Sequence, residues 1–255
     1  MDAPNARISV RDLTMAYGSF VVMKDLNFDI QEKDIFVIMG GSGCGKSTLL
    51  RHLIGLREPT KGDVFYDGEN FTQTDLADRG EFVKRFGVMY QSGALWSSLT
   101  LAENISMPIE ENTDLDRKTI DDLVSYKLAL VGLSGYEDYY PSQVSGGMNK
   151  RAGIARAMAL DPDILFLDEP GAGLDPLSSR RLDDLILRLR DSLGSTIVIV
   201  THELASIFAV ANNSIFLDTA TRTQGAIGNP KELRDYSDNP AVRLFLNRGE
   251  DPTSA

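Results

Sequence analysis

One eight-residue stretch constrains the fold of this chain more than any other: GGSGCGKS, at residues 40–47. It fits the pattern G-x-x-x-x-G-K-[S/T], and both of its neighbours have the character that this pattern needs. A continuous apolar run, DIFVIMG, leads into it and predicts a strand buried on both faces, whereas STLLRHLIGL predicts a helix. A strand, a glycine-rich loop and a helix in this order indicate a phosphate-binding loop in an α/β fold with a mostly parallel core sheet.

The residue types of this loop explain how it holds phosphate. Glycines let backbone N–H groups point inward around phosphate oxygens, and the helix N-terminus adds partial positive charge. We expect Lys46 to reach the β and γ phosphates of a nucleotide and Ser47 to ligate Mg²⁺. The motif alone leaves kinases, GTPases and motor proteins open. The residues expected to contact the nucleotide here are Gly40, Ser42, Gly43, Cys44, Gly45, Lys46, Ser47 and Thr48.

Polar side chains follow three further predicted strands. Asp168 and Glu169 end the run ILFLDEP, so we expect Asp168 to hold Mg²⁺ and Glu169 to orient or deprotonate an attacking water. His202, after STIVIVT, can donate to a γ-phosphate, and Gln91, at the end of FGVMYQ, can touch Mg²⁺ or the water. Taken alone, each also fits a structural role as a solvated acid, a packing histidine or a loop cap. The other histidine, His52, lies among leucines and is expected to pack or to face solvent.

The pattern of the whole chain predicts an α/β core interrupted by helices. ARISVRDLTMAYG and VVMKDLNFDI alternate apolar and polar residues around a Gly-Ser turn, which indicates an antiparallel hairpin. We expect the core and its antiparallel β subdomain in residues 7–91 and 162–228, and a helical subdomain in residues 92–161. Residues 229–255 form a tail with two short helices, each opened by Asn-Pro.

A second glycine-rich helix start lies inside the predicted helical subdomain. QVSGGMNKRAGIARAMAL places Ser145, Gly146 and Gly147 directly before an apolar-periodic run. Such a start also suits an anion. The chain therefore has two predicted phosphate-binding helix starts, which one bound nucleotide does not explain.

Composition excludes several classes of protein. The longest apolar runs are strand-length, and the N-terminus has no basic flank followed by an apolar stretch, so we expect no membrane span and no secretory signal. Cys44 is the only cysteine, which agrees with a reducing cytoplasmic compartment. The net charge of −11, spread along the chain, argues against nucleic acid as the main partner.

Taken together, these motifs resemble the ATPase subunit of an ABC transporter, over nearly the whole chain. The resemblance implies ATP and Mg²⁺ as cofactors, with Tyr17 stacked on adenine and Gln91 in the Q-loop. It also implies that residues 145–149 form the signature, that Asp175 belongs to the D-loop and that His202 is the switch histidine. For Tyr17, an aromatic closing a hairpin is an equally good interpretation. In this family two cassettes pack head to tail, so that the signature of one meets the γ-phosphate on the other's phosphate loop.

Two longer stretches, QSGALWSSLTLAENISMPIEENTDL and SGGMNKRAGIARAMALDPDILFLDEPGAGLDP, look like the cassettes of Mla-type, MCE-associated lipid transporters. VSGGM and GAGLD stand where LSGGQ and SALD are usual in the wider family. The resemblance implies a homodimer on the cytoplasmic face of the inner membrane, bound to two permease subunits. A periplasmic MCE-domain protein would handle phospholipid, and a small STAS-domain protein binds the cassette in some such systems. We expect the permease to dock near Ser92, Ala94, Leu95 and Trp96; alternatively, Trp96 packs inside the helical subdomain.

Three other functions remain open from the sequence. The first is an importer ATPase for another solute, such as an amino acid, since the cassette does not touch cargo. The second is a soluble ABC ATPase, of which the cluster-assembly type is harder to exclude than DNA repair or translation. The third is a degenerate cassette that binds ATP as a regulatory module, although Lys46, Asp168, Glu169 and His202 are intact.

Overall fold

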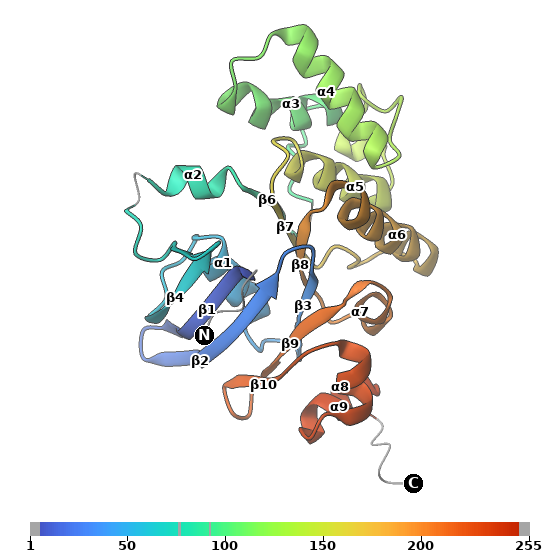
Figure 1. Ribbon diagram of the computed structural model, residues 1–255. Coiled ribbons are helices and arrows are strands. Elements are labelled where there is room, and N and C mark those ends of the chain that lie inside the picture. The colour runs from blue at the N-terminus through green and yellow to red at the C-terminus, as the bar shows by residue number, and fades with distance from the viewer. Residues whose placement is uncertain (1–5, 76–77, 92, 250–255) are drawn as a thin grey trace. The chain divides into compact units, whose positions relative to one another are not determined.

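The computed structural model describes residues 6–75, 78–91 and 93–249 of the chain (Figure 1). The chain divides into two compact units. The N/C unit combines the described residues up to Val83 with those from Thr196 onward, and the middle unit is Lys84–Ser195. Within the described residues, no helix combines the length and the apolar content that crossing a bilayer requires.

The N/C unit contains an antiparallel sheet with the strand order β2-β1-β4-β5. β1 and β2 pair up to Tyr17 and Phe20 across a turn in which Gly18 has φ 59°. This is the hairpin that the alternating sequence predicts. The elements of the unit are β1 (Ala6–Tyr17), β2 (Phe20–Gln31), β3 (Ile35–Gly40), α1 (Lys46–Leu53), β4 (Lys61–Tyr66), β5 (Glu69–Asn70), α2 (Arg79–Val83), β8 (Thr196–Val200), α7 (Leu204–Val210), β9 (Asn213–Asp218), β10 (Thr223–Ile227), α8 (Pro230–Tyr236) and α9 (Pro240–Leu246).

The remaining strands of this unit lie in the order β10-β9-β3-β8. β3 is parallel to both β8 and β9, with Ile38 opposite Val200 and Gly40 opposite Leu217. Every residue of β3 is buried, as the continuous apolar run predicts. The sheet therefore delivers the end of β3 directly into the phosphate loop.

The middle unit joins a pair of parallel strands to a set of helices. β6 and β7 pair with Met89 opposite Leu167, and α3 and α4 lie side by side (Figure 1). Thr100 opens α3 with a capping box, in which its side chain accepts from the Glu103 backbone N–H. The elements of the unit are β6 (Phe86–Met89), α3 (Leu101–Asn112), α4 (Arg117–Leu130), the 3₁₀ turn η1 (Pro141–Gln143), α5 (Gly146–Ala157), β7 (Ile164–Asp168) and α6 (Pro176–Leu193).

The predicted fold class is confirmed: an α/β chain with parallel strands, an antiparallel β subdomain and an inserted helical region. The two tail helices also begin where Asn-Pro predicts, since Asn229 and Asn239 cap α8 and α9 with their side chains. The sequence missed β5, α2 and β10, which are short and lack a clear periodicity. The subdomain boundaries at residues 91/92, 161/162 and 228/229 stay predictions.

Candidate functional site

The phosphate loop joins β3 to α1, and two of its glycines occupy positions that no other residue fits. Gly40 has φ 148° and Gly45 has φ 102°, a region that L side chains rarely adopt. A Cβ on Gly40 would lie 2.7 Å from Cys44 Sγ and 2.8 Å from the carbonyl oxygen of Leu217. A Cβ on Gly45 would lie 2.7 Å from Val22 Cγ1. Backbone conformation and packing together therefore require glycine at both positions.

Lys46 places its charge inside this loop. It is the first residue of α1, it is buried, and its ammonium donates to the carbonyl oxygens of Gly40 and Gly41, each at 3.0 Å. Ser42 and Gly43 are exposed, whereas Cys44 is buried and burial raises the pKa of its thiol. The loop thus presents exposed backbone, a helix N-terminus and a lysine, which fits a phosphate group.

Tyr17 ends β1 beside the helix that follows the loop. A hydrogen bond with the Thr48 side chain holds the pKa of the Tyr17 hydroxyl below its ordinary value. The guanidinium carbon of Arg57 lies 3.8 Å from the centroid of the ring, while the side chain remains 42% exposed. This position agrees with a base platform, and it agrees equally with a ring that closes the hairpin. The adenine contact stays a prediction.

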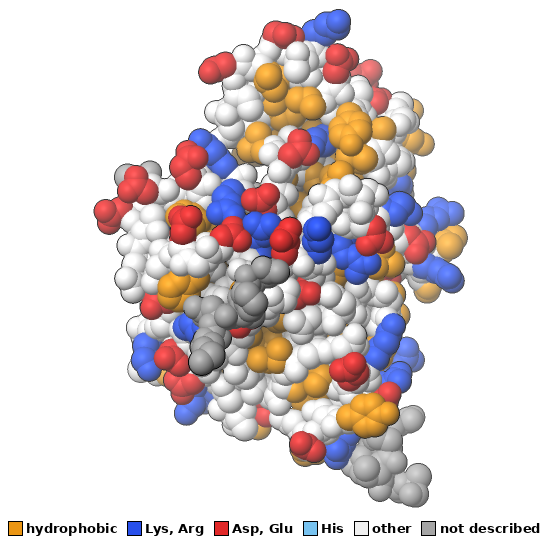
Figure 2. All heavy atoms as spheres, in the orientation of Figure 1, with side chains coloured by type: hydrophobic (Ala, Val, Ile, Leu, Met, Phe, Trp, Pro, Cys, Tyr) orange, Lys and Arg blue, Asp and Glu red, His pale blue; other side chains and the backbone are white. Residues whose placement is uncertain are grey.

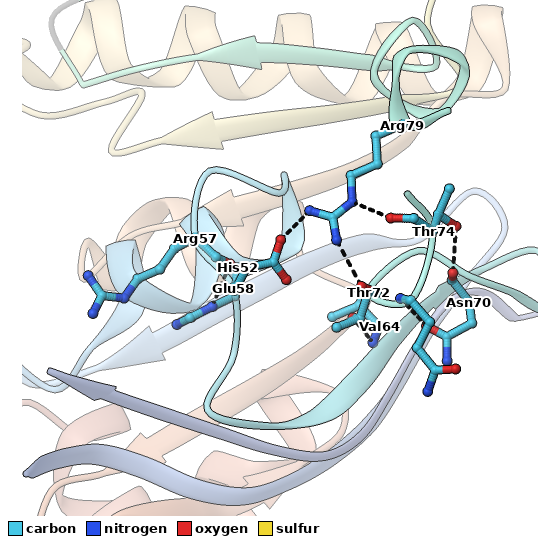
Figure 3. Close-up of polar contacts among 9 residues, drawn as sticks. His52, Arg57, Glu58, Val64, Asn70, Thr72, Thr74 and Arg79 are labelled. Carbon is cyan, nitrogen blue, oxygen red and sulfur yellow. Dashed lines mark hydrogen bonds and ion pairs between the residues drawn. The ribbon is translucent and has the colours of Figure 1, made fainter. Parts of the chain in front are cut away.

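His52 is a packing residue rather than a surface residue. It is 2% exposed in α1, and its Nδ1 lies 2.8 Å from the carbonyl oxygen of Arg57, a contact in which Nδ1–H donates (Figure 3). Burial lowers the pKa of the imidazole. Figure 3 also shows Arg79 pairing with Glu58 and donating to the carbonyl oxygen of Thr72 at 2.8 Å. These contacts hold the segment after α1 against the antiparallel sheet.

His202 follows β8, the strand next to β3 in the N/C unit. The Thr201 N–H donates to the carbonyl oxygen of Ile38 at 3.3 Å, which continues the parallel pairing to the strand end. His202 is exposed there. The phosphate loop and the predicted switch histidine therefore follow neighbouring parallel strands at the same edge of one sheet.

The middle unit repeats this arrangement with its own pair of strands. Because Met89 lies opposite Leu167, Gln91 and Glu169 follow β6 and β7 at the same edge. Gln91 is exposed, Asp168 is half-buried, and Glu169 is buried with φ 48°. A positive φ at a non-glycine residue is uncommon and concentrates at functional sites. Their catalytic roles stay predictions.

Among the predicted contact residues, Ser145 and Asp175 each cap a helix of the middle unit. Ser145 caps α5, since its hydroxyl accepts from the Met148 N–H at 3.2 Å, and both Ser145 and Gly146 are exposed. Asp175 caps α6 and accepts from Leu177 and Ser178. The hydrogen bond with the Ser178 side chain holds the pKa of Asp175 below its ordinary value. Both predicted contact residues thus already stabilise their own helices. A Cβ on Gly147 would meet Ser178 atoms at 3.5 Å, which is ordinary contact.

Lys150 was missed by the sequence analysis. It is buried on α5, and its ammonium donates to the carbonyl oxygens of Gln91 and of Glu169, the latter at 3.3 Å. Lys150 comes four residues before the buried Ile154 and therefore lies on the inner face of the helix. This spacing is the sequence signal that could have identified it.

A groove lies in the middle unit, with a cavity of about 250 Å³. Trp96 is 58% exposed beside it, so the alternative that this ring packs inside the unit is wrong. Ala94 is exposed and Leu95 half-buried, and Ser92 lies outside the described residues. On the face shown in Figure 2, apolar side chains gather over α3 and α4 between charged ones. The groove is lined by Phe86, Gly87, Val88, Trp96, Met107, Pro108, Glu111, Arg156, Ala157 and Leu160.

Comparison with known proteins identifies similar chains over nearly the whole length. A family model described as ABC transporter matches residues 23–172. A probable ribonucleotide transport ATP-binding protein, mkl, of Mycobacterium leprae (strain TN) is 40% identical over 240 residues, which cover 94% of this chain and 68% of the relative. The intermembrane phospholipid transport system ATP-binding protein MlaF of Haemophilus influenzae is 35% identical over 245 residues, covering 96% of this chain and 92% of that protein.

One solved structure is informative about assembly. It is the dimeric, post-hydrolysis state of an ATP-binding cassette bound to ADP and phosphate. It matches with a TM-score of 0.78 at 26% identity, covering 87% of this chain and 98% of the solved chain.

Proposed function

The chain belongs to the ABC transporter family, and we propose that it is the ATP-hydrolysing subunit of a transporter that moves phospholipid between the inner and outer membranes of a bacterium. The observation that carries ATP binding is the phosphate loop, in which only glycine fits at Gly40 and Gly45 around the buried Lys46. The observation that supports phospholipid as cargo is the likeness to a phospholipid transport ATPase over 92% of that protein's length.

Each catalytic role follows from the motif that the residue occupies. Lys46 binds the β and γ phosphates, and Tyr17 stacks on adenine. Glu169 accepts a proton from a water whose oxygen bonds to the γ-phosphorus while the bond to the ADP oxygen breaks, and His202 donates to the γ-phosphate.

The oxygen donors Ser47, Gln91 and Asp168 are of the kind that Mg²⁺ prefers. When bound, Mg²⁺ supplies positive charge that neutralises the β and γ phosphates. Within the described ranges, no cluster of three or more His, Cys, Asp or Glu side chains has the arrangement of a metal site.

We propose a head-to-tail homodimer in which each nucleotide is shared. The helix start at Ser145, Gly146 and Gly147, of which the first two are exposed, would serve the nucleotide on the partner cassette. Asp175, the cap of α6, would contribute to the same contact. The dimeric cassette of similar fold supports this arrangement. A shared nucleotide explains why one chain has two phosphate-binding helix starts.

We propose that the groove beside Trp96 receives a segment of the permease, with Ala94 and Leu95 at its edge and Ser92 next to them in the chain. Its lining is mostly apolar and includes the acidic Glu111 and the basic Arg156, which suits an amphipathic helix. The cassette would then lie on the cytoplasmic face of the inner membrane, held through two permease subunits. An MCE-domain protein would be reached through the permease, and a STAS-domain protein is a further candidate partner.

The decisive test of the enzyme is Glu169→Gln. It replaces the proton-accepting carboxylate with an amide of nearly the same size, so we expect ATP binding and an ATP-dependent dimer to persist while turnover stops. Lys46→Ala should instead lose nucleotide affinity. Nucleotide titration, sedimentation and phosphate release measure the three quantities. A Glu169→Gln chain that hydrolyses ATP at the unaltered rate would refute the assignment of Glu169.

A second cargo has support from a specific observation, since the mycobacterial relative is named for ribonucleotide transport and is the more identical of the two relatives. Purifying the membrane complex with its permease and extracting the bound molecules separates the two. Phospholipid supports the proposal, whereas a bound ribonucleotide or another solute without lipid contradicts it. If the chain does not co-sediment with membranes, a soluble ABC ATPase becomes the better interpretation.

A further inference from the structure

One face of α5 lies against the segment that follows Gln91. Lys150 donates to the carbonyl oxygen of Gln91 at the start of this segment. Three residues later, a Cβ on Gly153 would lie only 3.0 Å from Gly93 Cα, so the helix backbone touches the loop. After three more residues, Arg156 donates through an NH1 atom to the carbonyl oxygen of Ala94 at 2.6 Å. Residues spaced by three along α5 therefore contact Gln91, Gly93 and Ala94 in turn.

Lys150 also makes a second connection. Its ammonium also donates to the carbonyl oxygen of Glu169, the residue directly after β7. The same oxygen accepts from the Ala172 N–H at 3.2 Å. One buried side chain on the signature helix thus binds the backbone at the ends of both strands, where two predicted catalytic residues lie.

The chemistry of lysine suits this position. An ammonium has three donors and no acceptor, so one group can bind two carbonyl oxygens that point toward it from different strands. Hydrogen bonds from a charged donor are shorter and stronger than neutral ones. Glu169 has a left-handed backbone, with φ 48°, and surrounding contacts must maintain such a conformation. A charged donor on its carbonyl is one of these contacts.

We propose that Lys150 is a positioning residue for hydrolysis: it holds the backbones of Gln91 and Glu169 in register and joins them to the signature helix. The proposal rests on the proposed ATPase function and deepens it. Lys150 does not touch the nucleotide; it acts through the geometry of the two residues whose carbonyls it binds. Through Arg156, which lines the groove, the same helix links that geometry to the proposed docking site.

Lys150→Met tests this, because methionine keeps an apolar stem of similar length and loses every donor. We expect kcat for ATP to fall by up to about 100-fold, as for other small misplacements of reacting groups, while the nucleotide dissociation constant stays unchanged. Lys150→Arg keeps a charged donor and should recover most of the activity. The matched control is Lys127→Met, which removes another buried lysine of the middle unit, one that is paired with Asp161. Melting temperatures of all three variants report any loss of folding.

Amide hydrogen exchange provides a readout that does not need activity. The Ala172 N–H bonds to Glu169 and the Gly93 N–H bonds to Tyr90, so both report the backbone that Lys150 holds. We expect both amides to lose protection in Lys150→Met and to keep it in Lys127→Met.

The outcomes separate the two proposals. A Lys150→Met chain with the turnover of the unaltered protein, or one that loses no more than Lys127→Met, overturns the positioning role. If the unaltered chain hydrolyses no ATP, the proposed function fails, and hydrogen exchange still decides on Lys150. Unchanged protection of Ala172 and Gly93 would then count against it.

Discussion

The buried side chain of His52 affects the stability of the folded chain and has no part in the proposed catalytic chemistry. Its Nδ1–H donates to the Arg57 carbonyl, and its Nε2 is a buried atom with no hydrogen-bond partner among the described residues. Protonation would put a charge on that buried nitrogen. This explains why burial lowers the pKa of His52 in the folded chain.

This buried imidazole predicts a loss of stability in mild acid. Because the folded pKa lies below the unfolded value of about 6.5, the unfolded chain binds a proton first as the pH falls. The contribution of His52 is therefore complete above about pH 6.5 and is lost as the pH falls toward the folded pKa. We expect His52→Gln to lose less stability than the unaltered chain between about pH 7.5 and about pH 5.5 in urea unfolding.

The other histidine serves as the control for this measurement. His202→Gln leaves the His52 imidazole and its contact with Arg57 in place, so the acid-dependent loss that His52 causes should remain. If His52→Gln shows the same pH dependence as the unaltered chain, the buried imidazole is not the cause.

Sequence alone predicts the phosphate loop better than it predicts the contacts that Lys150 makes at the strand ends. The loop is local: eight adjacent residues carry the motif, and the predicted strand and helix on either side are confirmed. Lys150 binds Gln91, 59 positions away, and Glu169, 19 positions away. Sequence spacing cannot predict which carbonyls a buried lysine meets over such separations, because the pairing of β6 with β7 decides it.

At the scale of elements, α5 and β6 approach so closely that glycine is required between them. A Cβ on Gly87 would lie 2.1 Å from the carbonyl oxygen of Ala157 and 2.7 Å from Leu165 Cδ2. Neither backbone can move without disturbing the helix or the strand pair. The packing of α5 on β6 thus depends on the absence of a side chain at Gly87.

We predict that Gly87→Ala destabilises the chain by about 1–3 kcal/mol through overpacking. Gly80→Ala is the control, because Gly80 lies in α2 and a Cβ there meets nothing within 4 Å. This control should be neutral or should stabilise the helix by up to about 1 kcal/mol. Urea unfolding measures both free energies. Equal stability of the two variants would show that α5 moves to make room.

For the whole molecule, the helix starts at the phosphate loop and at Ser145 have different roles. The first acts within one chain, and the second acts only in the proposed dimer. The phosphate loop lies in the N/C unit, whereas Ser145 caps a helix of the middle unit with an exposed N-terminus. In the proposed dimer, this N-terminus meets the nucleotide of the partner cassette. Loss of Ser145 should then affect the assembled enzyme more than the single chain.

We predict that Ser145→Ala lowers ATP turnover strongly and leaves nucleotide binding by the monomer unchanged. Removing the cap should also cost about 1 kcal/mol of folding stability. Asp116→Ala is matched to it, since Asp116 caps α4 through the Thr119 N–H and has no proposed contact with nucleotide. It should cost similar stability with normal turnover. If Ser145→Ala reduced monomer binding as much as turnover, the shared-nucleotide dimer would be wrong.

Neighbouring residues alone predict the phosphate loop, the strand before it, the helix starts at Ser145, Asn229 and Asn239, and the class of the fold. These features depend on steric and hydrogen-bonding preferences that act within a few residues. Only the tertiary structure decided that His52 is buried, that Trp96 is exposed and that Lys150 binds two strand ends. Burial and long-range hydrogen bonds depend on which surfaces meet, and that is settled by strand pairing and helix packing across the chain.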